Sequence, residues 1–358
     1  MQLTFTVRLD PAEAFTAIVD ELHVALDRLG MDLQTGPQGR LLQNSEVVAR
    51  ITHWEPPRHA AFEWIATPWQ RGDRPQLDVR LVPDSGGTRV TIEQTAWSTR
   101  LDNDALETVG WFAGELVAPL LVAMSPQRLG DWVTDRRARR PTGPQARAIY
   151  RDPIYHRPNF LAILDVLRLQ PADHLVEIGC GGGAFLLDAL RSGCRAAAID
   201  HSADMVRTAS ELNRESIASG RLEILEADAT SLPFLSGAFT CAVTTSVFGF
   251  IEDPESALAE IFRVLAPGGR FVLFTAGKAL RGTLAAPEPM ASRLHFYEDA
   301  ELEGLVRRAG FARARFEHPD FETLAKQAGV PQEAIPLYRI PGTSQLLVAQ
   351  KAQPGEQV

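Results

Sequence analysis

The sequence predicts two domains, an antiparallel α+β domain followed by an α/β domain with a doubly wound parallel sheet. The length of 358 residues exceeds that of a usual single domain, and division by roughly 150 residues per domain gives an expectation of two. Up to about residue 140, the pattern reads as strand, helix, strands and long helix. After Pro171, strand-like and helix-like segments alternate, which is typical of a parallel sheet with helices on both faces.

The first domain begins with a strand and a helix. Residues 3–9 alternate apolar and polar side chains, which is the period of a half-buried strand. Asp10 and Pro11 then supply an N-cap and a proline at the first helical position. Apolar residues at three- and four-residue spacing continue this helix to about Leu29.

Antiparallel strands and a long helix complete the first domain. Strand-like segments are predicted at 47–51, 60–65, 77–81 and 90–92. A helical pattern runs from Asn103 to about Arg139 and is bent or broken at Pro119 and Pro126. The order of elements is therefore strand, helix, strands and long helix.

Residues 1–140 resemble the helix-grip domains of the START-like superfamily, in particular the Hsp90-ATPase-activator-homologue branch. The resemblance rests on the segment 51–64, on the sequence Gly-Gly-Thr-Arg-Val-Thr from Gly86, and on the terminal helix. It implies a curved antiparallel sheet wrapped around a long C-terminal helix, with an apolar cavity between them. Contact with a chaperone is implied only by the resemblance to this branch, and no residue of the sequence supports it.

A change in composition marks the boundary between the domains. Four arginines at 136, 137, 139 and 140 precede Pro141-Thr-Gly-Pro144, a stretch that few contacts are expected to cross. We therefore predict domains at 1–140 and 150–358, joined by a linker at 141–149. The arginines are either a solvated helix end, whose cations complement the helix dipole, or an anion site.

Composition favours a small-molecule partner. A net charge of -9 disfavours nucleic acid, whose binding depends on Lys and Arg. Cys180, Cys194 and Cys241 form no CxxC pair, so neither a disulfide framework nor a metal site is predicted. The sequence shows no basic and apolar leader, and its longest apolar stretch, 116–124, is shorter than the roughly 18 residues of a membrane span. A cytoplasmic protein without a membrane span is expected.

A glycine-rich turn follows the first strand of the second domain. The glycines of Gly179-Cys-Gly-Gly-Gly183 permit a tight turn and close approach of the backbone to a ligand where a helix begins. The turn also satisfies the GxGxxG/A dinucleotide fingerprint, and Asp200 lies about 20 residues on, where it could bind a ribose. Both cofactor classes remain open on this motif.

Three further features separate the two cofactor classes. Glu177 is a carboxylate that could receive the cationic amino group of a methionine moiety, which a nicotinamide cofactor lacks. Asp228 and Ala229 follow the third strand, with Leu232-Pro-Phe close behind, which suits an adenine held between a carboxylate and apolar walls. The segment 260–272 places a helix end and a glycine turn before another strand.

Together these residues resemble the class I S-adenosylmethionine-dependent methyltransferases, particularly the branch of ubiquinone and menaquinone biosynthesis, over residues 150–350. The resemblance implies a Rossmann-like α/β fold and S-adenosylmethionine as cofactor. It assigns Glu177, Gly179, Gly181 and Gly183 to the methionine end, Asp200 to the ribose hydroxyls, Asp228 with Ala229 to the adenine, and His201 and Met205 to the adenine pocket. Ser246, at the end of the fourth strand, is a further predicted cofactor contact. Asp200 could instead be a helix N-cap.

Methyl transfer from a sulfonium requires chiefly that the acceptor be held in line with the methyl group. If the acceptor is a phenol or another hydroxyl, a base helps, and His295 and Tyr297 are the candidates, although either could be a packed aromatic residue. A possible lid over the cofactor comes from Tyr150, Asp152, Tyr155 and His156, which precede the first helix of the second domain. Tyr155 is the first candidate among them, and the alternative is that these residues pack between domains. Residues 320–341 form an insertion that we expect to shape the substrate mouth.

The predicted function is transfer of a methyl group from S-adenosylmethionine to a small, apolar or aromatic acceptor, on oxygen or carbon. The fourth strand ends without the Asn/Asp-Pro-Pro-aromatic motif, which disfavours methylation of amines. One alternative is a cofactor-sensing ligand-binding or co-chaperone-like module without turnover. Another is a nicotinamide-dependent oxidoreductase, which Glu177, Asp228 and the segment 265–269 oppose.

Overall fold

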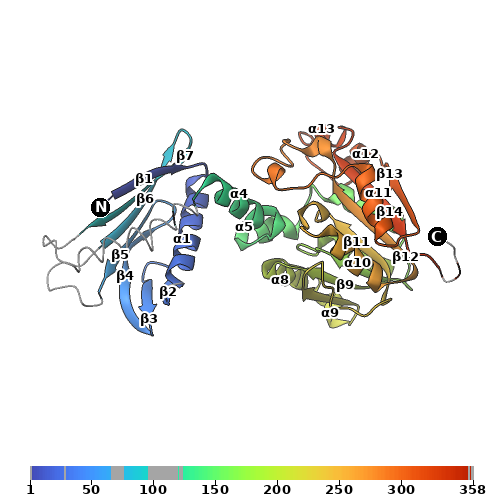
Figure 1. Cartoon of the computed structure of the whole chain (residues 1–358), viewed down its shortest axis with the longest axis horizontal. Helices are drawn as coiled ribbons and strands as arrows, with labels where there is room; N and C mark the ends of the chain where they lie inside the picture. Colours follow the sequence, from blue (N-terminus) through green and yellow to red (C-terminus); the bar gives the residue numbers. More distant parts are fainter. Residues whose placement is uncertain are drawn as a thin grey trace. The chain divides into compact units, whose positions relative to one another are not determined.

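The chain forms two compact units, Met1–Trp132 and Val133–Val358. The structure, a computed structural model, describes residues 2–27, 30–65, 76–95, 120, 124–353 and 355 (Figure 1). Each unit has its own sheet, and the two are described separately below.

The first unit is an antiparallel sheet with one described helix between its first two strands. Its elements are β1 (Gln2–Val7), α1 (Pro11–Asp27), β2 (Met31–Gln34), β3 (Arg40–Gln43), β4 (Glu46–Glu55), β5 (His59–Trp64), β6 (Gln76–Asp84) and β7 (Gly87–Thr95). The strand order is β1-β7-β6-β5-β4-β3-β2, and every neighbouring pair is antiparallel. The expected antiparallel sheet is confirmed.

The helix α1 begins and packs as its sequence predicts. The Oδ1 atom of Asp10 accepts hydrogen bonds from the amides of Ala12 and Glu13, at 2.9 and 3.0 Å, so the expected N-cap forms. The apolar stripe that includes Phe15, Ile18, Leu22 and Leu26 is buried. Most of the predicted long helix, at 103–119 and 121–123, lies outside the described residues. Its described end comprises α4 (Pro126–Thr134) and a π-helix at Asp135–Arg139.

The second unit has a mixed seven-stranded sheet. Its strands are β8 (His174–Ile178), β9 (Arg195–Asp200), β10 (Leu222–Glu226), β11 (Phe239–Thr245), β12 (Leu265–Ala276), β13 (Arg313–Glu317) and β14 (Ser344–Gln350). The order is β10-β9-β8-β11-β12-β14-β13. The first five strands of this order are parallel, whereas β14 runs antiparallel to both of its neighbours. The α/β prediction is confirmed, and the antiparallel β14 makes the sheet mixed rather than wholly parallel.

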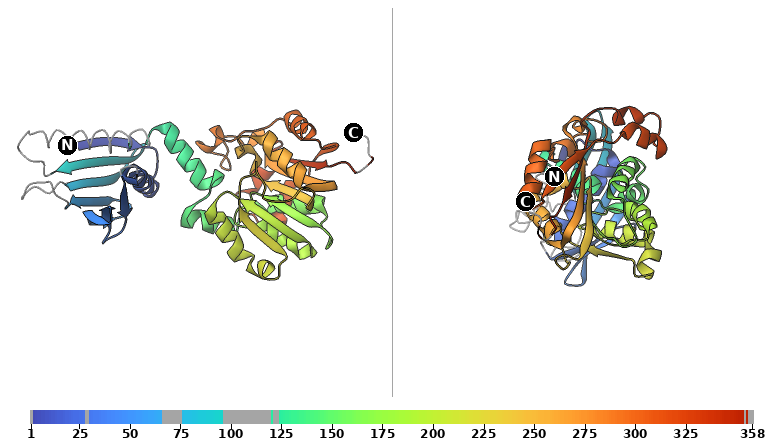
Figure 2. Two further views of the ribbon diagram at one scale, coloured as in Figure 1. Left: turned by 60° about the horizontal axis from the view of Figure 1, so that its bottom comes forward. Right: turned by 90° about the vertical axis from the view of Figure 1, so that its right-hand side faces the viewer.

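Helices cover both faces of this sheet (Figure 2). They are α5 (Gly143–Arg151), α6 (Arg157–Leu167), α7 (Ala184–Ala189), α8 (Ala203–Leu212), α9 (Arg214–Ala218), α10 (Pro254–Val264), α11 (Asp299–Arg308), α12 (Phe321–Gln327) and α13 (Ile335–Tyr338). Among the helices that the structure describes, none is both long and apolar enough to cross a bilayer.

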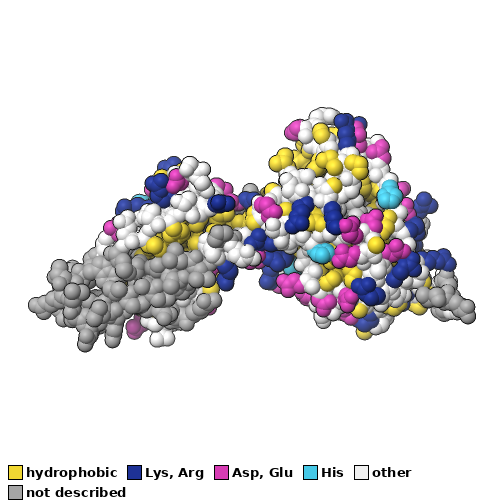
Figure 3. Space-filling view, turned by 45° about the horizontal axis from the view of Figure 1, so that its top comes forward, with side chains coloured by type: hydrophobic (Ala, Val, Ile, Leu, Met, Phe, Trp, Pro, Cys, Tyr) yellow, Lys and Arg dark blue, Asp and Glu magenta, His cyan; other side chains and the backbone are white. Residues whose placement is uncertain are grey.

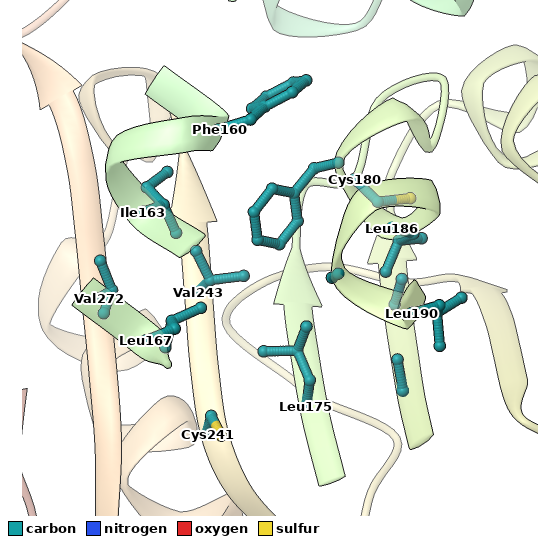
Figure 4. Packing of buried hydrophobic residues seen from close by; sticks show 14 of the residues in the cluster. Phe160, Ile163, Leu167, Leu175, Cys180, Leu186, Leu190, Cys241, Val243 and Val272 are labelled. Atoms are coloured by element: carbon teal, nitrogen blue, oxygen red, sulfur yellow. The ribbon is translucent and has the colours of Figure 1, made fainter. Parts of the chain in front are cut away.

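Two apolar cores lie on opposite faces of the sheet because strand side chains alternate. Leu175 of β8 belongs to the core under α6 and α7, and the next residue, Val176, belongs to the core under α10 and α11. Figure 4 shows the first core, where Phe160, Ile163 and Leu167 of α6 face the strands. Burial of these cores fixes the register of the strands and hence the side chains at their carboxyl ends.

The structure differs from the linker expected at 141–149. Most of this stretch belongs to α5, which hydrogen bonds tie to α8: the amide of Gly143 and Nη1 of Arg147 donate to Oδ2 of Asp204, at 2.7 and 2.8 Å. Just before α5, the hydroxyl of Ser202 donates to the carbonyl of Pro141 at 2.6 Å. Proline and glycine here mark a helix start, not a free segment.

Candidate functional site

A cavity of about 1460 Å³ opens at the carboxyl ends of the parallel strands of the second unit. Strand ends bring together loops that are far apart in sequence, which is where doubly wound sheets bind ligands. Predicted site residues that line the cavity are Tyr155, Glu177, Gly179, Gly181, Asp200, His201, Asp228, Ala229 and Ser246. The loop between β12 and α11, together with α12 and α13, supplies much of the apolar remainder.

The glycine turn after β8 is required by close packing. The φ angle of Gly179 is 74°, and a Cβ atom there would lie 2.4 Å from Cγ2 of Val247. A Cβ atom on Gly182 would lie 2.1 Å from the carbonyl oxygen of Tyr150, at the end of α5. Since a backbone atom cannot yield as a flexible side chain does, this turn accommodates only glycine without a shift.

Glu177 is the most unusual group in the cavity. Its side chain is 2% exposed, and its Oε2 atom has no hydrogen-bond partner among the described residues. Burial, and next the charge of Asp200, raise the pKa of Glu177 well above its ordinary value. A buried carboxylate without a donor is costly, so this site favours a ligand that brings a cation or a hydrogen-bond donor to Glu177.

Two further carboxylates end the neighbouring strands. Asp200, at the end of β9, accepts hydrogen bonds from the amides of Gly181 at 2.8 Å and Ser202 at 2.9 Å. Burial raises the pKa of Asp200, although both amides oppose this shift. Asp228 follows β10, and hydrogen bonds from the hydroxyl and amide of Thr230 lower its pKa. Asp228 is therefore an ionised acceptor at neutral pH, while Asp200 also supports the glycine turn.

Ser246 has a strained backbone at the end of β11. Its φ angle of 59° lies in the left-handed region, which residues other than glycine rarely adopt, and its amide donates to the carbonyl of Phe274 at 2.9 Å. Next to it, the buried Oγ1 of Thr245 has no partner among the described residues. Such strain and unsatisfied groups cluster at functional sites.

Some predicted site residues lie elsewhere. Met205 is fully buried on the inner face of α8, and it is absent from the cavity lining, as is Gly183. Instead, Gly183 permits close packing, since a Cβ atom there would lie 2.8 Å from that of Ala209. His201 does line the cavity, and its Nε2 atom hydrogen-bonds to the carbonyl of Arg139.

The structure does not bring the two predicted catalytic residues to the cavity. His295 is half-exposed and forms a hydrogen bond of 3.1 Å with Glu301, and its ring contacts that of Tyr297. Tyr297 is buried against Phe248, and burial raises its pKa to about 12. Both residues pack against neighbouring side chains, as expected under the alternative that they are packed aromatic residues. Neither lines the cavity, where a base would be needed.

Two of the cavity residues, Tyr150 and His156, come from the segment that was predicted as a possible lid, whereas Asn159 was not assigned to the site from the sequence. Tyr150 lies against the glycine turn and donates its hydroxyl to the carbonyl of Arg137 at 3.2 Å. His156 and Asn159 line the cavity from the start of α6. Their spacing of three residues at a helix start was a signal, because it places both side chains on one face. The sequence does not show that this face of α6 lines the cavity, because that depends on the direction in which the helix crosses the sheet.

Comparisons with known proteins show similarity to methyltransferases. Residues 176–273 match the family model described as a methyltransferase domain. The chain is 41% identical over 98 residues to a demethylmenaquinone methyltransferase of Thermus thermophilus. This aligned stretch covers 26% of this chain and 42% of that protein. It is 31% identical over 165 residues to a demethylmenaquinone methyltransferase of Clavibacter sepedonicus, which covers 43% of this chain and 62% of that protein.

A solved structure of a SAM-dependent methyltransferase from Aquifex aeolicus superimposes with a TM-score of 0.45 at 17% identity, over 58% of this chain and 98% of that one. The chain spans less than two thirds of the length of each of the two curated relatives described above. Residues 176–273 of the second unit are thus similar to the methyltransferase domain family and to curated methyltransferases.

Proposed function

We propose that this protein transfers a methyl group from S-adenosylmethionine to a small apolar acceptor. The observation that carries the proposal is the unpartnered Oε2 of Glu177, buried beside a glycine turn at the carboxyl edge of the sheet. An α-amino group, as a cationic donor, satisfies such an atom. The cofactor supplies a methyl group already activated on a sulfonium.

The residues present fit this cofactor. Glu177 and the backbone of the glycine turn would hold its methionine end, and Asp200 would accept hydrogen bonds from the ribose hydroxyls. Asp228 would accept a hydrogen bond from the adenine, with Ala229 beside the ring. These groups lie at or just after the carboxyl ends of three adjacent strands, in the order β10, β9 and β8, so the sheet sets their positions. The chain's own part is to orient the donor and to exclude water.

The first unit is, in this proposal, a helix-grip domain. Its support is the antiparallel sheet with α1 between β1 and β2, and the helix α4 that follows later in the chain. The predicted domains at 1–140 and 150–358 correspond to the two compact units, which divide at Trp132 and Val133, and hydrogen bonds to Asp204 attach α5 to the second unit.

Calorimetric titration of S-adenosylhomocysteine into the full chain tests the proposal. Wild type should bind it, and Asp200→Ala should weaken binding by about 10-fold or more, because hydrogen bonds to charged groups contribute roughly 1.5–3 kcal/mol. Asp165→Ala is the matched control, since Asp165 is exposed on α6 and does not line the cavity. NADH should not bind.

Two results would contradict the proposal. Folded wild type that binds NADH but not S-adenosylhomocysteine would indicate an oxidoreductase. Tight binding of the cofactor, with no acceptor-dependent conversion of S-adenosylmethionine to S-adenosylhomocysteine by mass spectrometry, would favour a cofactor-sensing module.

A further inference from the structure

One face of the first turn of α6 lines the cavity. His156, at the N-cap, is followed at three and four residues by Asn159 and Phe160, and all three line the cavity. Residues at this spacing share one face of a helix. The chain runs from α6 into the amino end of β8. The N-terminus of α6 therefore lies at the carboxyl edge of the sheet, and Figure 4 shows Phe160 nearer that edge than Leu167.

The polar groups on this face have no protein partner. Among the described residues, neither the imidazole of His156 nor the amide of Asn159 forms a side-chain hydrogen bond, although Asn159 is 9% exposed. The backbone of His156 is fixed, since its amide donates to Pro153 at 2.8 Å and its carbonyl accepts from Asn159 at 3.0 Å. A fixed backbone with free polar groups is the arrangement expected where a ligand supplies the partner.

The imidazole of His156 is uncharged at neutral pH. Burial lowers its pKa, and no charged neighbour offsets this effect. Titratable and charged residues that line the same cavity are Arg137, Arg139, Tyr150, Tyr155, Glu177, Cys180, Asp200, His201, Asp228, Glu252, Asp253, Glu288, Glu333 and Tyr338. An uncharged imidazole has a free nitrogen that accepts a proton.

His156 lines the cavity together with polar groups at the strand ends and apolar groups from α12 and α13. Glu177 shares the strand face of Leu175, which packs under α6, so Glu177 lies on the same side of the sheet as α6. The helix α6 also packs against α12, where the ring centroid of Phe321 lies 5.8 Å from that of Phe274. Tyr338 of α13 donates its hydroxyl to the carbonyl of Tyr155 at 2.7 Å.

The part of the cavity lining that comes from α12, α13 and the segment after β12 suits an uncharged, apolar body. Its walls include Phe274, Phe321, Leu337 and Leu284, the last of which is 98% exposed at the rim. In Figure 3, hydrophobic side chains gather on the upper part of the second unit. Among the described lining residues, Arg137 and Arg139 are the only arginines or lysines, and both come from the π-helix. A large anionic group would therefore find no cation here from α12 or α13.

We propose that His156 is the general base for this reaction and that the acceptor is an uncharged apolar or aromatic molecule with a hydroxyl group. The inference rests on the proposed function. The acceptor O–H donates to the free imidazole nitrogen, and Asn159 holds the acceptor oxygen. As the new O–CH₃ bond forms, the bond from methyl carbon to sulfur breaks and its electron pair stays on sulfur. The hydroxyl proton moves to His156, and the resulting imidazolium releases it to solvent.

The ionisation of a bound phenol tests this role without turnover. The full chain, saturated with S-adenosylhomocysteine, is titrated with 4-nitrophenol and with 4-nitro-1-naphthol, whose phenolate and phenol forms differ in absorbance. In wild type and in the exposed control His318→Gln, the bound probe should ionise at a pH about one unit or more below that in His156→Gln. One unit corresponds to about 1.4 kcal/mol of interaction with the phenolate and its proton acceptor.

Several results would overturn the inference. Equal ionisation of the probe in wild type and His156→Gln would exclude a base at this position, and the same shift in His295→Gln would transfer the role to His295. Loss of S-adenosylhomocysteine binding in His156→Gln would place His156 in the cofactor site. If neither probe binds wild type that does bind S-adenosylhomocysteine, the acceptor class is wrong while the proposed function stands.

A second variant distinguishes loss of the base from a folding defect. Asn159→Ser removes the amide but not the base, so it should weaken probe binding about 10-fold, as loss of a buried hydrogen bond does. Its affinity for S-adenosylhomocysteine should match that of wild type. Unchanged probe binding in Asn159→Ser would contradict the placement of the acceptor oxygen.

Discussion

Replacement of Glu177 by glutamine should change stability and cofactor affinity in opposite directions. The raised pKa of Glu177 means that the folded protein binds a proton more tightly than the unfolded chain does. The free energy of unfolding of the free wild type therefore falls as pH rises from the unfolded pKa, about 4.3, to the folded one, by at most about 1.4 kcal/mol per pH unit. Glu177→Gln loses this dependence and should be the more stable protein at high pH.

The affinity for S-adenosylhomocysteine should fall in the same variant. A charge-assisted hydrogen bond to a buried carboxylate contributes about 1.5–3 kcal/mol, which corresponds to a loss of roughly 10- to 150-fold. At a ligand concentration 100 times the wild-type dissociation constant, wild type gains about 2.7 kcal/mol, whereas a variant weakened 30-fold gains only about 0.9 kcal/mol. At roughly 2–4 °C per kcal/mol, the melting temperature should rise by about 5–11 °C in wild type and about 2–4 °C in the variant.

Thermal unfolding between pH 5 and 9, with and without the ligand, measures both effects. Glu223→Gln is the matched control, because Glu223 is an exposed glutamate on β10 of the same sheet and does not line the cavity. The control should behave as wild type. A Glu177→Gln protein with unchanged ligand affinity would refute the role given to this carboxylate, whatever its stability.

Three other substitutions test the surroundings of the site. Gly182→Ala would bring a Cβ atom 2.1 Å from the carbonyl oxygen of Tyr150, so we expect a loss of about 1–3 kcal/mol in denaturant unfolding, and an unchanged midpoint would contradict this packing. Ser246→Gly should raise the melting temperature, since glycine removes about 1 kcal/mol of strain at a φ angle of 59°; a lower one would show that the serine side chain outweighs the strain. Tyr338→Phe loses the 2.7 Å hydrogen bond to Tyr155, so titration should show weaker 4-nitro-1-naphthol binding by about 0.5–1.5 kcal/mol and unchanged S-adenosylhomocysteine binding. Equal losses of both ligands would instead indicate a general defect.

The cofactor end of the site could be predicted from the sequence because its signals are local. Glu177 and Gly179 stand two residues apart, across the end of β8, so the strand pattern alone places them at one edge of the sheet. Asp200 ends the next strand in the same way. Met205 was misplaced because it lies only five residues beyond Asp200, but the first turn of α8 directs its side chain into the core.

The acceptor end could not be predicted because it depends on tertiary contacts. His156 belongs to the cavity through the path of α6 across the sheet and through the packing of α6 on α12, which begins 165 residues later at Phe321. His295 was a candidate base from the sequence, yet it does not line the cavity and instead contacts Glu301 and Tyr297. The antiparallel course of β14 likewise depends on its pairing with both β12 and β13.

Buried polar atoms without hydrogen-bond partners among the described residues lie at the carboxyl ends of β8 and β11. They relate the cofactor part of the proposed site to its acceptor part. Glu177 and Thr245 both point to the face under α6, because Val243 pairs with Glu177 and Thr245 lies two residues further along β11. The Oε2 atom of Glu177 and the Oγ1 atom of Thr245 have no partners among the described residues, and each such buried group costs about 1–3 kcal/mol. A cationic amino group can satisfy Glu177, but Thr245 requires a separate donor or acceptor. We therefore expect an acceptor with a hydroxyl group to raise the free energy of unfolding of the cofactor-bound protein. The same apolar molecule without its hydroxyl group should raise it less.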